Sequence, residues 1–229
     1  AIGEDALVPL SGRSNLQYHF SLLDTHIINA FAVPGGYVYI TRGILAQMNS
    51  EAELAFILGH EIGHIAAKHT AQFISQQRGY SILEYLSTLL LGKKTTEDFE
   101  PIVGQVTGLA ILGYGRDNEL ESDMLGYKMC TRADYNGLEA TQILVTFQRL
   151  EQYEPNLFEV LLSTHPPTSE RIKRIDKEIK KNPPDKKSYI GRNSYIKSIA
   201  NLYIGATPQA GWVDDEGYFN AYIGLSLPL

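Results

Sequence analysis

Two histidines and a glutamate with metal-site spacing are the residues of this sequence best suited to chemistry. They form the run His60-Glu61-Ile62-Gly63-His64, within a segment whose apolar residues follow a helical pattern. Residues i and i+4 of a helix share one face, so both imidazoles can bind one tetrahedral Zn²⁺. Glu61 follows the first ligand and can take a proton from the attacking water. The pattern predicts a hydrolytic zinc site; a solvated helix face with two surface histidines is the competing interpretation.

A catalytic zinc site needs a third protein ligand. The longer motif that supplies it as a histidine is absent, because Ala67 and Thr70 stand where its glycine and histidine would be. Glu119 and Asp123 are four residues apart in a later predicted helix and share a face, whereas Glu121 points away. One carboxylate of the pair can bind the metal while the other accepts a ring N–H from a ligand histidine. Spacing alone favours Glu119, keeps Glu121 as second choice, and leaves an acidic solvated helix start as the competing interpretation.

Three further residues near the motif carry expectations of their own. His69 lies five residues beyond His64, so it points elsewhere on a continuous helix and is predicted to be a surface residue. Gly59 and Gly63 each cost about 1 kcal/mol relative to alanine inside a helix. We expect these two glycines to permit close approach of another backbone or to relieve a crowded site.

The elements that must position these residues are predicted from periodicity, caps and turns. Ser50 and Glu53 have capping-box spacing at the start of the zinc-motif helix. We expect an α+β fold, a helical domain around that helix with a small sheet on one side. Strands are predicted at residues 17–22, 29–33 and 37–41, and helices at 51–77, 81–91, 102–112, 117–131, 138–153, 157–162 and 168–181.

Length and a change of composition suggest two parts. The chain has 229 residues, enough for one large domain or one domain with an appendage. Pro183-Pro184-Asp185 breaks the chain, and the residues after it are rich in tyrosine, glycine and alternating apolar residues. We expect a catalytic domain over residues 1–182 and a helix-plus-hairpin appendage over residues 183–229, which ends on a strand-like run as a truncated module would.

Composition and charge exclude several classes of protein. The 20 basic and 26 acidic residues give a net charge of −6, which argues against a nucleic-acid partner. The single cysteine, Cys130, excludes an intramolecular disulfide and a multi-cysteine zinc site, and we expect it to be buried in a helix. No apolar run reaches the roughly 18 residues of a membrane span. No signal peptide is visible and the first residue is not methionine, which leaves export open.

In their order along the chain, these motifs resemble the zinc metallopeptidase family of the CAAX prenyl proteases, the HtpX heat-shock proteases and the BepA-like periplasmic proteases. That family combines the first motif with a Glu-x-x-x-Asp motif, matched by Glu119 and Asp123. Two further matches are residues 29–43, Asn-Ala-Phe-Ala-Val-Pro-Gly-Gly-Tyr-Val-Tyr-Ile-Thr-Arg-Gly, and Ser163-Thr164-His165-Pro166-Pro167 with Glu170-Arg171 after it. The resemblance covers residues 17–180 and is strongest to the soluble BepA-like branch. Ser122 replaces the usual alanine, at a position that is not a ligand.

The resemblance implies a mainly helical, gluzincin-type domain that holds one zinc ion. His60, His64 and Glu119 would be the ligands, and Glu61 the catalytic base. Asp123 would orient a ligand histidine from outside the coordination sphere.

The resemblance also gives the loop around His165 a role, because in relatives this loop lies over the metal. His165 would stabilise the oxyanion of the tetrahedral intermediate. Alternatively, it would bind the zinc itself and keep the resting site closed. Arg171 would help the same charge or hold the loop, and Arg116 is expected to be structural.

Substrate binding is predicted along the strand segment that precedes the zinc helix. An exposed edge strand there, through Asn29, Phe31 and Val33, would pair with an extended peptide and impose little sequence preference. An ordinary core hairpin is the competing interpretation. Residues 81–112 are expected to form a lid, a peripheral membrane contact or a plain pair of core helices.

Together the motifs and the resemblance imply a zinc endopeptidase that hydrolyses unfolded or misassembled proteins. Its substrates would be polypeptides, its location the bacterial periplasm or cell envelope with the cytoplasm left open, and its partner a separate helical-repeat domain. Two other functions stay open. One is a chaperone or assembly module with a self-inhibited zinc site. The other is a non-peptidase zinc hydrolase with a closed small-molecule pocket.

Overall fold

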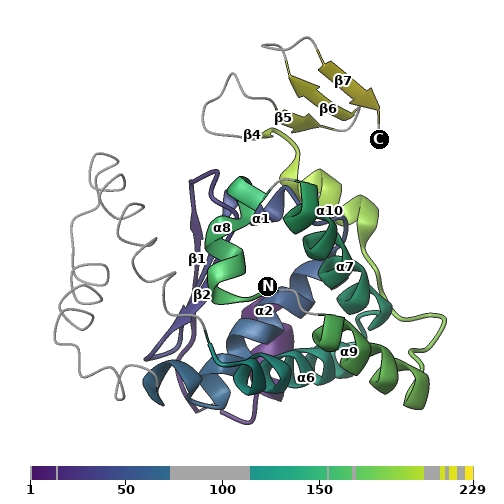
Figure 1. Cartoon of the computed structure of the whole chain (residues 1–229). Coiled ribbons are helices and arrows are strands. Elements are labelled where there is room, and N and C mark those ends of the chain that lie inside the picture. The colour runs from purple at the N-terminus through teal and green to yellow at the C-terminus, as the bar shows by residue number, and fades with distance from the viewer. Residues whose placement is uncertain are drawn as a thin grey trace, which may run out of the picture.

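The computed structural model of the chain describes residues 2–13, 15–72, 114–153, 155–166, 169–203, 212–214, 217–220 and 225–228 (Figure 1). In these residues the fold is mostly helical with a small mixed sheet, which confirms the predicted α+β class. The predicted helices at 81–91 and 102–112, and the lid or membrane contact assigned to them, lie outside the described residues. No helix among the described residues is both long and apolar enough to cross a membrane.

A three-stranded sheet forms one side of the domain, as predicted (Figure 1). Its strands β1 (His19–Leu23), β2 (Ala30–Val33) and β3 (Tyr37–Thr41) lie in the order β1-β3-β2. β1 runs parallel to β3, and β2 runs antiparallel to it with Phe31 opposite Tyr39. The β2–β3 turn uses Gly36 at φ +97°, where a Cβ would lie 2.1 Å from the Gln17 carbonyl oxygen. Because β3 lies between the other two strands, β2 is an edge strand of the sheet.

The zinc-motif helix α2 (Glu51–Ala66) begins at the predicted cap and ends earlier than predicted. Ser50 Oγ accepts the Glu53 backbone N–H at 3.1 Å, while the Glu53 carboxylate accepts the N–H of Asn49, one residue further back than in a standard capping box. Helix α2 stops at Ala66, and Lys68 follows with φ +64°. The prediction of one helix as far as residue 77 is therefore wrong.

Two pairs of small residues let α2 and α6 (Arg116–Arg132) pack closely. A Cβ on Gly59 would lie 3.0 Å from the Gly126 Cα, and one on Gly63 would lie 3.1 Å from the Ser122 carbonyl oxygen. Few real Cβ contacts are so short, so the predicted close approach at these glycines is confirmed. The crossing brings the histidine face of α2 against the carboxylates of α6.

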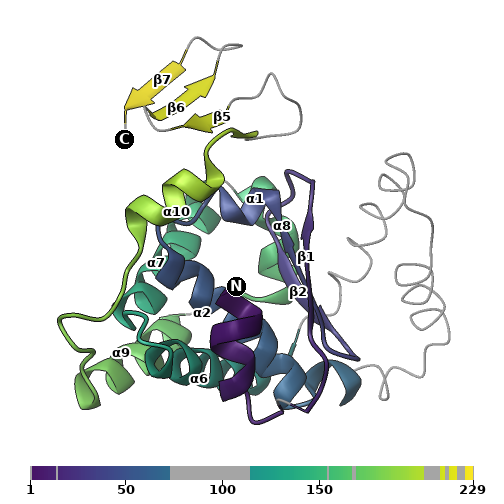
Figure 2. The ribbon, with the colours of Figure 1, turned by 180° about the vertical axis from the view of Figure 1, so that it is seen from behind.

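The remaining helices surround this pair. Helix α7 (Leu138–Tyr153) has its predicted bounds, and α9 (Ser169–Lys181) agrees with its prediction. Helix α8 (Pro155–Thr164) is longer than predicted, and the N-cap of α6 is Gly115, which provides no side-chain cap. Three short elements, η1 (Ile2–Leu7), η2 (Val8–Leu10) and α1 (Arg42–Leu45), complete the described part of the domain. In the view from behind, η1 lies across α2 (Figure 2).

The core lies between α2, the sheet, η1 and α7. Among its fully buried side chains are Leu7, Ile44, Phe56, Ile62 and Ile143. Cys130 is buried as predicted, and burial raises the pKa of its thiol. The zinc-motif helix therefore runs through the interior, and its histidines are held by packing on several sides.

A helix and a second sheet follow the predicted domain boundary. They comprise α10 (Arg192–Ile199) and the antiparallel strands β4 (Leu202–Tyr203), β5 (Trp212–Asp214), β6 (Gly217–Asn220) and β7 (Leu225–Pro228), in the order β4-β5-β6-β7. Tyr195 is buried and donates its hydroxyl to the Leu45 carbonyl at 2.6 Å, and the Ala52 N–H donates to the Ile190 carbonyl at 3.1 Å. The segment around α10 thus packs on the helical domain, and the boundary after residue 182 stays a prediction.

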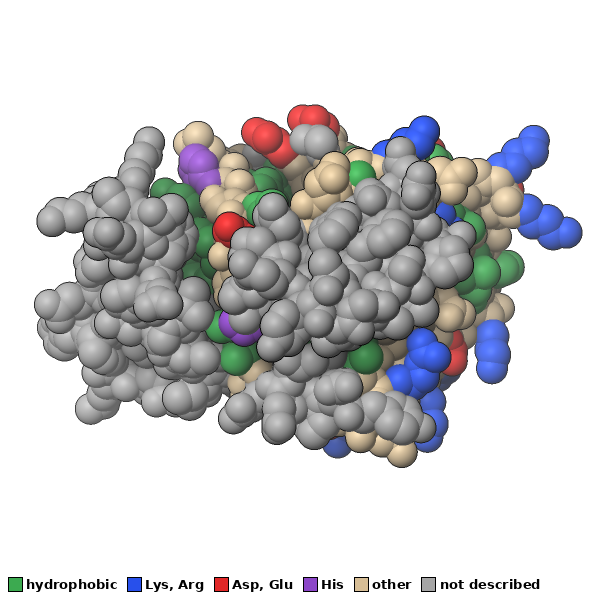
Figure 3. All heavy atoms as spheres, turned by 90° about the horizontal axis from the view of Figure 1, so that it is seen from above, with side chains coloured by type: hydrophobic (Ala, Val, Ile, Leu, Met, Phe, Trp, Pro, Cys, Tyr) green, Lys and Arg blue, Asp and Glu red, His purple; other side chains and the backbone are tan. Residues whose placement is uncertain are grey.

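Basic side chains gather on one side of the molecule although the net charge is negative. In the view from above, Lys and Arg stand out on the side of α9, α10 and the segment between them (Figure 3). The last turn of α9 carries Lys180 and Lys181, both exposed, where cations are favoured by the helix dipole. The metal-site residues are instead buried between α2 and α6.

Candidate active site

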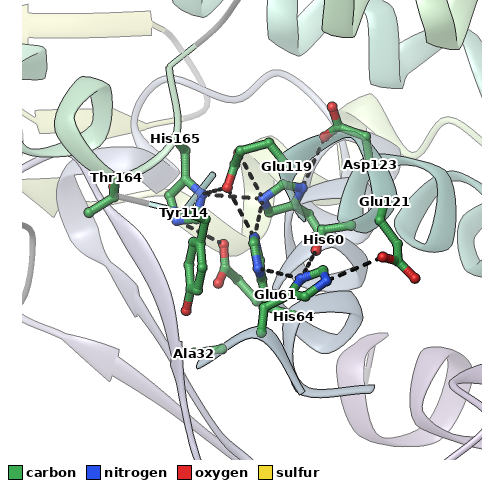
Figure 4. Close-up of polar contacts among 12 residues, drawn as sticks. Ala32, His60, Glu61, His64, Tyr114, Glu119, Glu121, Asp123, Thr164 and His165 are labelled. Atoms are coloured by element: carbon green, nitrogen blue, oxygen red, sulfur yellow. Dashed lines mark hydrogen bonds and ion pairs between the residues drawn. The ribbon is translucent and has the colours of Figure 1, made fainter. Parts of the chain in front are cut away.

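The two motif histidines of α2 point their Nε2 atoms at one place (Figure 4). One helical turn separates His60 from His64, and their Nε2 atoms are 3.0 Å apart. Glu119, from α6, completes the triangle: its Oε1 is 3.2 Å from His64 Nε2 and its Oε2 is 3.5 Å from His60 Nε2. All three side chains are buried. Two helices that lie far apart in sequence thus converge on one small volume.

His165 comes to the same place from the segment after α8. Its Nδ1 is 3.0 Å from Glu119 Oε1 and 3.3 Å from His60 Nε2. Together with the two motif histidines and Glu119, it offers a set of four ligand atoms that lie within 4.8 Å of one another. Its Nε2 faces Glu61 Oε1 at 3.6 Å. His165 therefore lies over the cluster, between the carboxylates of Glu119 and Glu61.

The residues present fit a zinc ion. His60 Nδ1 contacts the Asp123 carboxylate at 2.9 Å, so its proton belongs on Nδ1 and its Nε2 carries a lone pair. The facing Nε2 atoms of His60 and His64 are then best satisfied by a cation between them. Two imidazole nitrogens and a carboxylate oxygen form a donor set that suits zinc. Among the described residues, Glu61 Oε2 and His165 Nε2 are buried and have no hydrogen-bond partner, as expected for groups that face a metal and its substrate.

Arg171 connects the outer parts of the cluster. Its guanidinium donates from Nε to Asp123 Oδ2 and from Nη2 to Asp123 Oδ1, each at 2.7 Å. Its Nη1 lies 3.0 Å from Glu119 Oε2 and donates to the His165 carbonyl at 3.2 Å. The buried guanidinium thus holds the carboxylate behind His60, the Glu119 side chain and the His165 segment. Arg116, by contrast, is exposed and pairs with Glu170.

Burial and neighbouring charges set the protonation of the cluster. Burial acts to raise the pKa of Asp123, but Arg171 outweighs it and lowers that pKa to about 2. Burial opposes the ionised form of Glu119 too, yet His165 and Arg171 hold its pKa well below the usual range. Burial lowers the pKa of His64 well below its usual value and raises that of Glu61. A neutral histidine and an ionised carboxylate are the forms that bind a metal, and a raised pKa makes Glu61 the better base.

Neighbouring carboxylates also set the protonation of His165. Burial lowers the pKa of His165, but the nearby charges of Glu119 and Glu61 outweigh it, so the pKa is raised. A protonated His165 is a donor at both ring nitrogens. That form suits an oxyanion donor, whereas the neutral form suits a metal ligand.

The prediction that His69 is a surface residue is wrong. His69 is 3 % exposed, and its Nδ1 lies 3.1 Å from His64 Nδ1 and 3.3 Å from Ser122 Oγ. The prediction assumed one continuous helix, whereas the chain turns at Lys68, whose φ is positive. No glycine or proline marks this turn in the sequence. Glu121 points away from the metal cluster, as predicted, and its Oε2 lies 3.4 Å from His69 Nε2.

Tyr114 is a second neighbour of the site that the sequence did not identify. Its ring stacks on the His64 ring with centroids 3.8 Å apart and planes 23° apart. Its hydroxyl is 2.7 Å from Thr70 Oγ1. Tyr114 carries no spacing signal, because it lies outside the predicted helices and reaches His64 through the fold.

The predicted substrate strand is at the sheet edge but is not exposed. Asn29, Phe31 and Val33 are all buried, contrary to the expectation of an exposed strand. The Asn29 carbonyl accepts the Thr41 N–H at 3.0 Å, so the main-chain groups of Asn29 face β3. Antiparallel pairing alternates along a strand, and the groups of Phe31 and Val33 therefore face β3 as well.

The same alternation identifies the main-chain groups on the free edge of β2. These belong to Ala30 and Ala32, not to the three residues predicted from sequence. The Ala32 carbonyl accepts the Thr70 hydroxyl at 3.5 Å, and Thr70 lies just beyond the C-terminal end of α2. Residues close to the C-terminal end of α2 thus border this edge.

A helix-borne pair of histidines, an adjacent buried glutamate and a carboxylate from a second helix define a zinc metallopeptidase domain. Comparison with protein families gives the same class, since the family described as Peptidase family M48 matches residues 2–179. The chain belongs to peptidase family M48.

Curated relatives of two kinds share this domain. Mitochondrial metalloendopeptidase OMA1 of Schizosaccharomyces pombe is 28% identical over 177 residues, 74% of this chain and 49% of the relative. The protein of the same name from Arabidopsis thaliana is 28% identical over 161 residues, 70% of this chain and 31% of the relative. Beta-barrel assembly-enhancing protease of Yersinia pestis is 28% identical over 161 residues, 68% of this chain and 33% of the relative. The chain thus spans about a third to a half of the length of these relatives.

Proposed function

We propose that this chain is a zinc endopeptidase in which His60, His64 and Glu119 hold the metal. The observation that carries the proposal is the convergence of two α2 imidazoles and an α6 carboxylate, each buried and each within 3.5 Å of another. When bound there, zinc would polarise the scissile carbonyl and lower the pKa of water. Membership of a peptidase family makes a peptide bond the expected target.

Glu61 is the proposed base. It follows His60 in α2 and is buried, and its Oε2 has no hydrogen-bond partner in the part of the chain that the structure describes. Its carboxylate takes a proton from the attacking water and returns it to the leaving amine. His165 lies 3.6 Å from Glu61 across the same space and donates to the developing oxyanion. Asp123 fixes the His60 ring through the 2.9 Å contact to Nδ1, and Arg171 fixes Asp123.

The substrate we propose is an extended, unfolded polypeptide that adds a strand to the free edge of β2. Ala30 and Ala32 are themselves buried, and the Ala32 carbonyl accepts the Thr70 hydroxyl, so their main-chain groups would pair with the peptide only when this edge opens. Pairing of this kind reads the backbone, so it suits a protease that acts on many unfolded or misassembled sequences. The Yersinia relative is named as a β-barrel assembly-enhancing protease, which supports a quality-control role.

The place of action we propose is the bacterial periplasm or cell envelope. The Yersinia relative supports this location, because it comes from a bacterium and its name refers to β-barrel assembly. The relatives named as mitochondrial share the same domain and would place the chain in a different compartment. The greater length of the relatives is consistent with a separate helical-repeat partner region. A peripheral membrane contact through residues 81–112 stays a prediction, because those residues lie outside the described ones.

Cleavage of one protein in two states tests this proposal. The zinc-loaded chain is incubated with a reduced, alkylated protein and with the same protein in its folded form, and fragments are resolved by mass spectrometry. We expect cleavage of the unfolded form and its loss when a chelator removes the metal. His64→Ala should lose both zinc and cleavage. Full zinc occupancy in His64→Ala would refute the ligand assignment, and equal cleavage of both forms would refute the substrate class.

A protein-binding assembly module with a self-inhibited site is a second candidate. The position of His165 favours it, because His165 Nδ1 lies 3.0 Å from Glu119 and 3.3 Å from His60, within the ligand cluster. A fourth protein ligand would occupy the position that a catalytic site keeps open. His165→Ala separates the two functions: cleavage rises if His165 closes the site, and falls if His165 stabilises the oxyanion.

A further inference from the structure

We propose that His69 is a positioning residue that accepts the Nδ1–H of His64 and thereby sets how His64 presents its Nε2 to the metal. The inference rests on the proposed ligand set, to which it adds the partner of the second histidine. The observation behind it is the 3.1 Å contact between the Nδ1 atoms of two buried histidines.

The placement of protons decides which histidine donates. His64 Nε2 points into the cluster, 3.2 Å from Glu119 Oε1, and must be free of a proton to bind a metal. The ring proton of neutral His64 then lies on Nδ1, which faces His69 Nδ1. His69 can accept a hydrogen bond from this N–H only if its own Nδ1 carries no proton. The contact is therefore a hydrogen bond from His64 to His69 when His69 carries its own proton on Nε2.

The far side of the His69 ring favours this tautomer. Its Nε2 faces Glu121 Oε2 at 3.4 Å, so an Nε2–H has a carboxylate to donate to. Ser122 Oγ lies 3.3 Å from His69 Nδ1 and contributes a second polar contact at the accepting atom. The order Glu121, His69, His64, metal gives each ring nitrogen along it a partner.

The two motif histidines are then held by different chemistry. His60 donates to a carboxylate, Asp123, whereas His64 donates to a neutral ring. Tyr114 stacks on the face of the His64 ring and limits its tilting about the Cβ–Cγ bond. The bond to His69 adds a directional contact at the Nδ1 edge of the same ring. Outer partners of metal-ligand histidines commonly play this part, and losing one costs about 10- to 100-fold in metal affinity.

Two substitutions at His69 separate hydrogen bonding from packing. His69→Phe keeps an aromatic ring but has no acceptor, whereas His69→Asn can place its amide oxygen near the former Nδ1. Zinc affinity is measured by competition with a chromophoric chelator, and the Co²⁺-loaded proteins are compared by visible absorption. His26→Asn, at an exposed histidine, is the matched control.

We expect His69→Phe to raise the zinc dissociation constant by about 10- to 100-fold and to change the Co²⁺ bands. His69→Asn should recover at least about tenfold of that loss, and His26→Asn should match the wild type. Unchanged affinity in His69→Phe would overturn the inference. Equal losses in His69→Phe and His69→Asn would also overturn it, because they would show a packing role alone.

A variant at Glu121 keeps the inference testable should the core substitution prevent folding. Glu121 is 60 % exposed, so Glu121→Ala leaves the core intact, with exposed Glu151→Ala on α7 as its control. Glu121→Ala should weaken zinc binding by less than His69→Phe does, and it should shift the Co²⁺ spectrum. A zinc affinity and a Co²⁺ spectrum equal to those of Glu151→Ala would contradict the proposed order of contacts. Wild-type protein that binds no zinc, or His64→Ala that binds it normally, would instead refute the proposed ligand set.

Discussion

Replacing Gly126 by alanine should damage the metal site from a distance, because Gly126 sets how closely α6 approaches α2. A Cβ at this position would lie 2.7 Å from the His60 backbone nitrogen and 2.9 Å from the Gly59 carbonyl carbon. Both neighbours are backbone atoms of the zinc-motif helix, so no side chain can turn aside. The added methyl group can be accommodated only if the two helices separate at their crossing.

The size of that separation follows from the contact distances. Ordinary contact of a Cβ begins near 3.4 Å, so a contact of 2.7 Å requires a separation of about 0.7 Å. Overpacking of this kind costs about 1–3 kcal/mol, of which a gain of about 1 kcal/mol in helix propensity offsets a part. Metal–ligand distances tolerate only about 0.2 Å, so zinc binding should suffer more than folding.

The assay compares urea denaturation and zinc affinity in the same variants. Gly126→Ala should lower the free energy of unfolding by about 1–2 kcal/mol and weaken zinc binding at least about tenfold. Gly115→Ala is the control, since a Cβ there would meet nothing within 4 Å. Wild-type zinc affinity in Gly126→Ala would refute the argument that the helix crossing positions the ligands.

Three further results are expected. Arg171→Met removes the buried guanidinium from two buried carboxylates and should cost about 3–5 kcal/mol in urea denaturation, whereas Arg116→Met, at an exposed pair, should stay within about 0.5 kcal/mol. In metal-free protein Asp123 has a pKa lowered to about 2, so its contribution of roughly 2 kcal/mol is present above the unfolded value near 4 and is lost as the pH falls through 2. The stability difference between wild type and Asp123→Asn should therefore shrink between pH 4 and pH 2, and a constant difference would contradict this. Ser50→Ala removes the α2 cap together with the 3.1 Å contact of its hydroxyl to buried Glu139, and should cost at least about 1 kcal/mol by the same denaturation measurement; unchanged stability would contradict this.

The sequence predicts most of the elements because each has a strong local signal. Strand β3, an aromatic and β-branched run, and helix α7, with its clear apolar periodicity, have their predicted bounds. The start of α2 was predicted from the spacing of Ser50 and Glu53. The close approach at Gly59 was predicted from the cost of a glycine within a helix.

The features that the sequence did not reveal depend on tertiary structure. His69 was assigned to the surface because the turn at Lys68 has no glycine or proline to mark it. Tyr114 reaches His64 from a distant part of the chain. At the sheet edge, the pattern predicted the strand but not its burial, nor which alternate residues face outward. Local patterns define elements, whereas these contacts depend on how the elements pack.

Turnover and zinc content of Glu61→Gln, measured side by side with the wild type, test the central claim most directly. Glutamine keeps the size of the side chain and removes the base. Because Glu61 is proposed as the base and not as a ligand, both proteins should bind one zinc per chain, and only the wild type should cleave an unfolded protein such as casein. Cleavage by zinc-loaded Glu61→Gln at the wild-type rate would contradict the account.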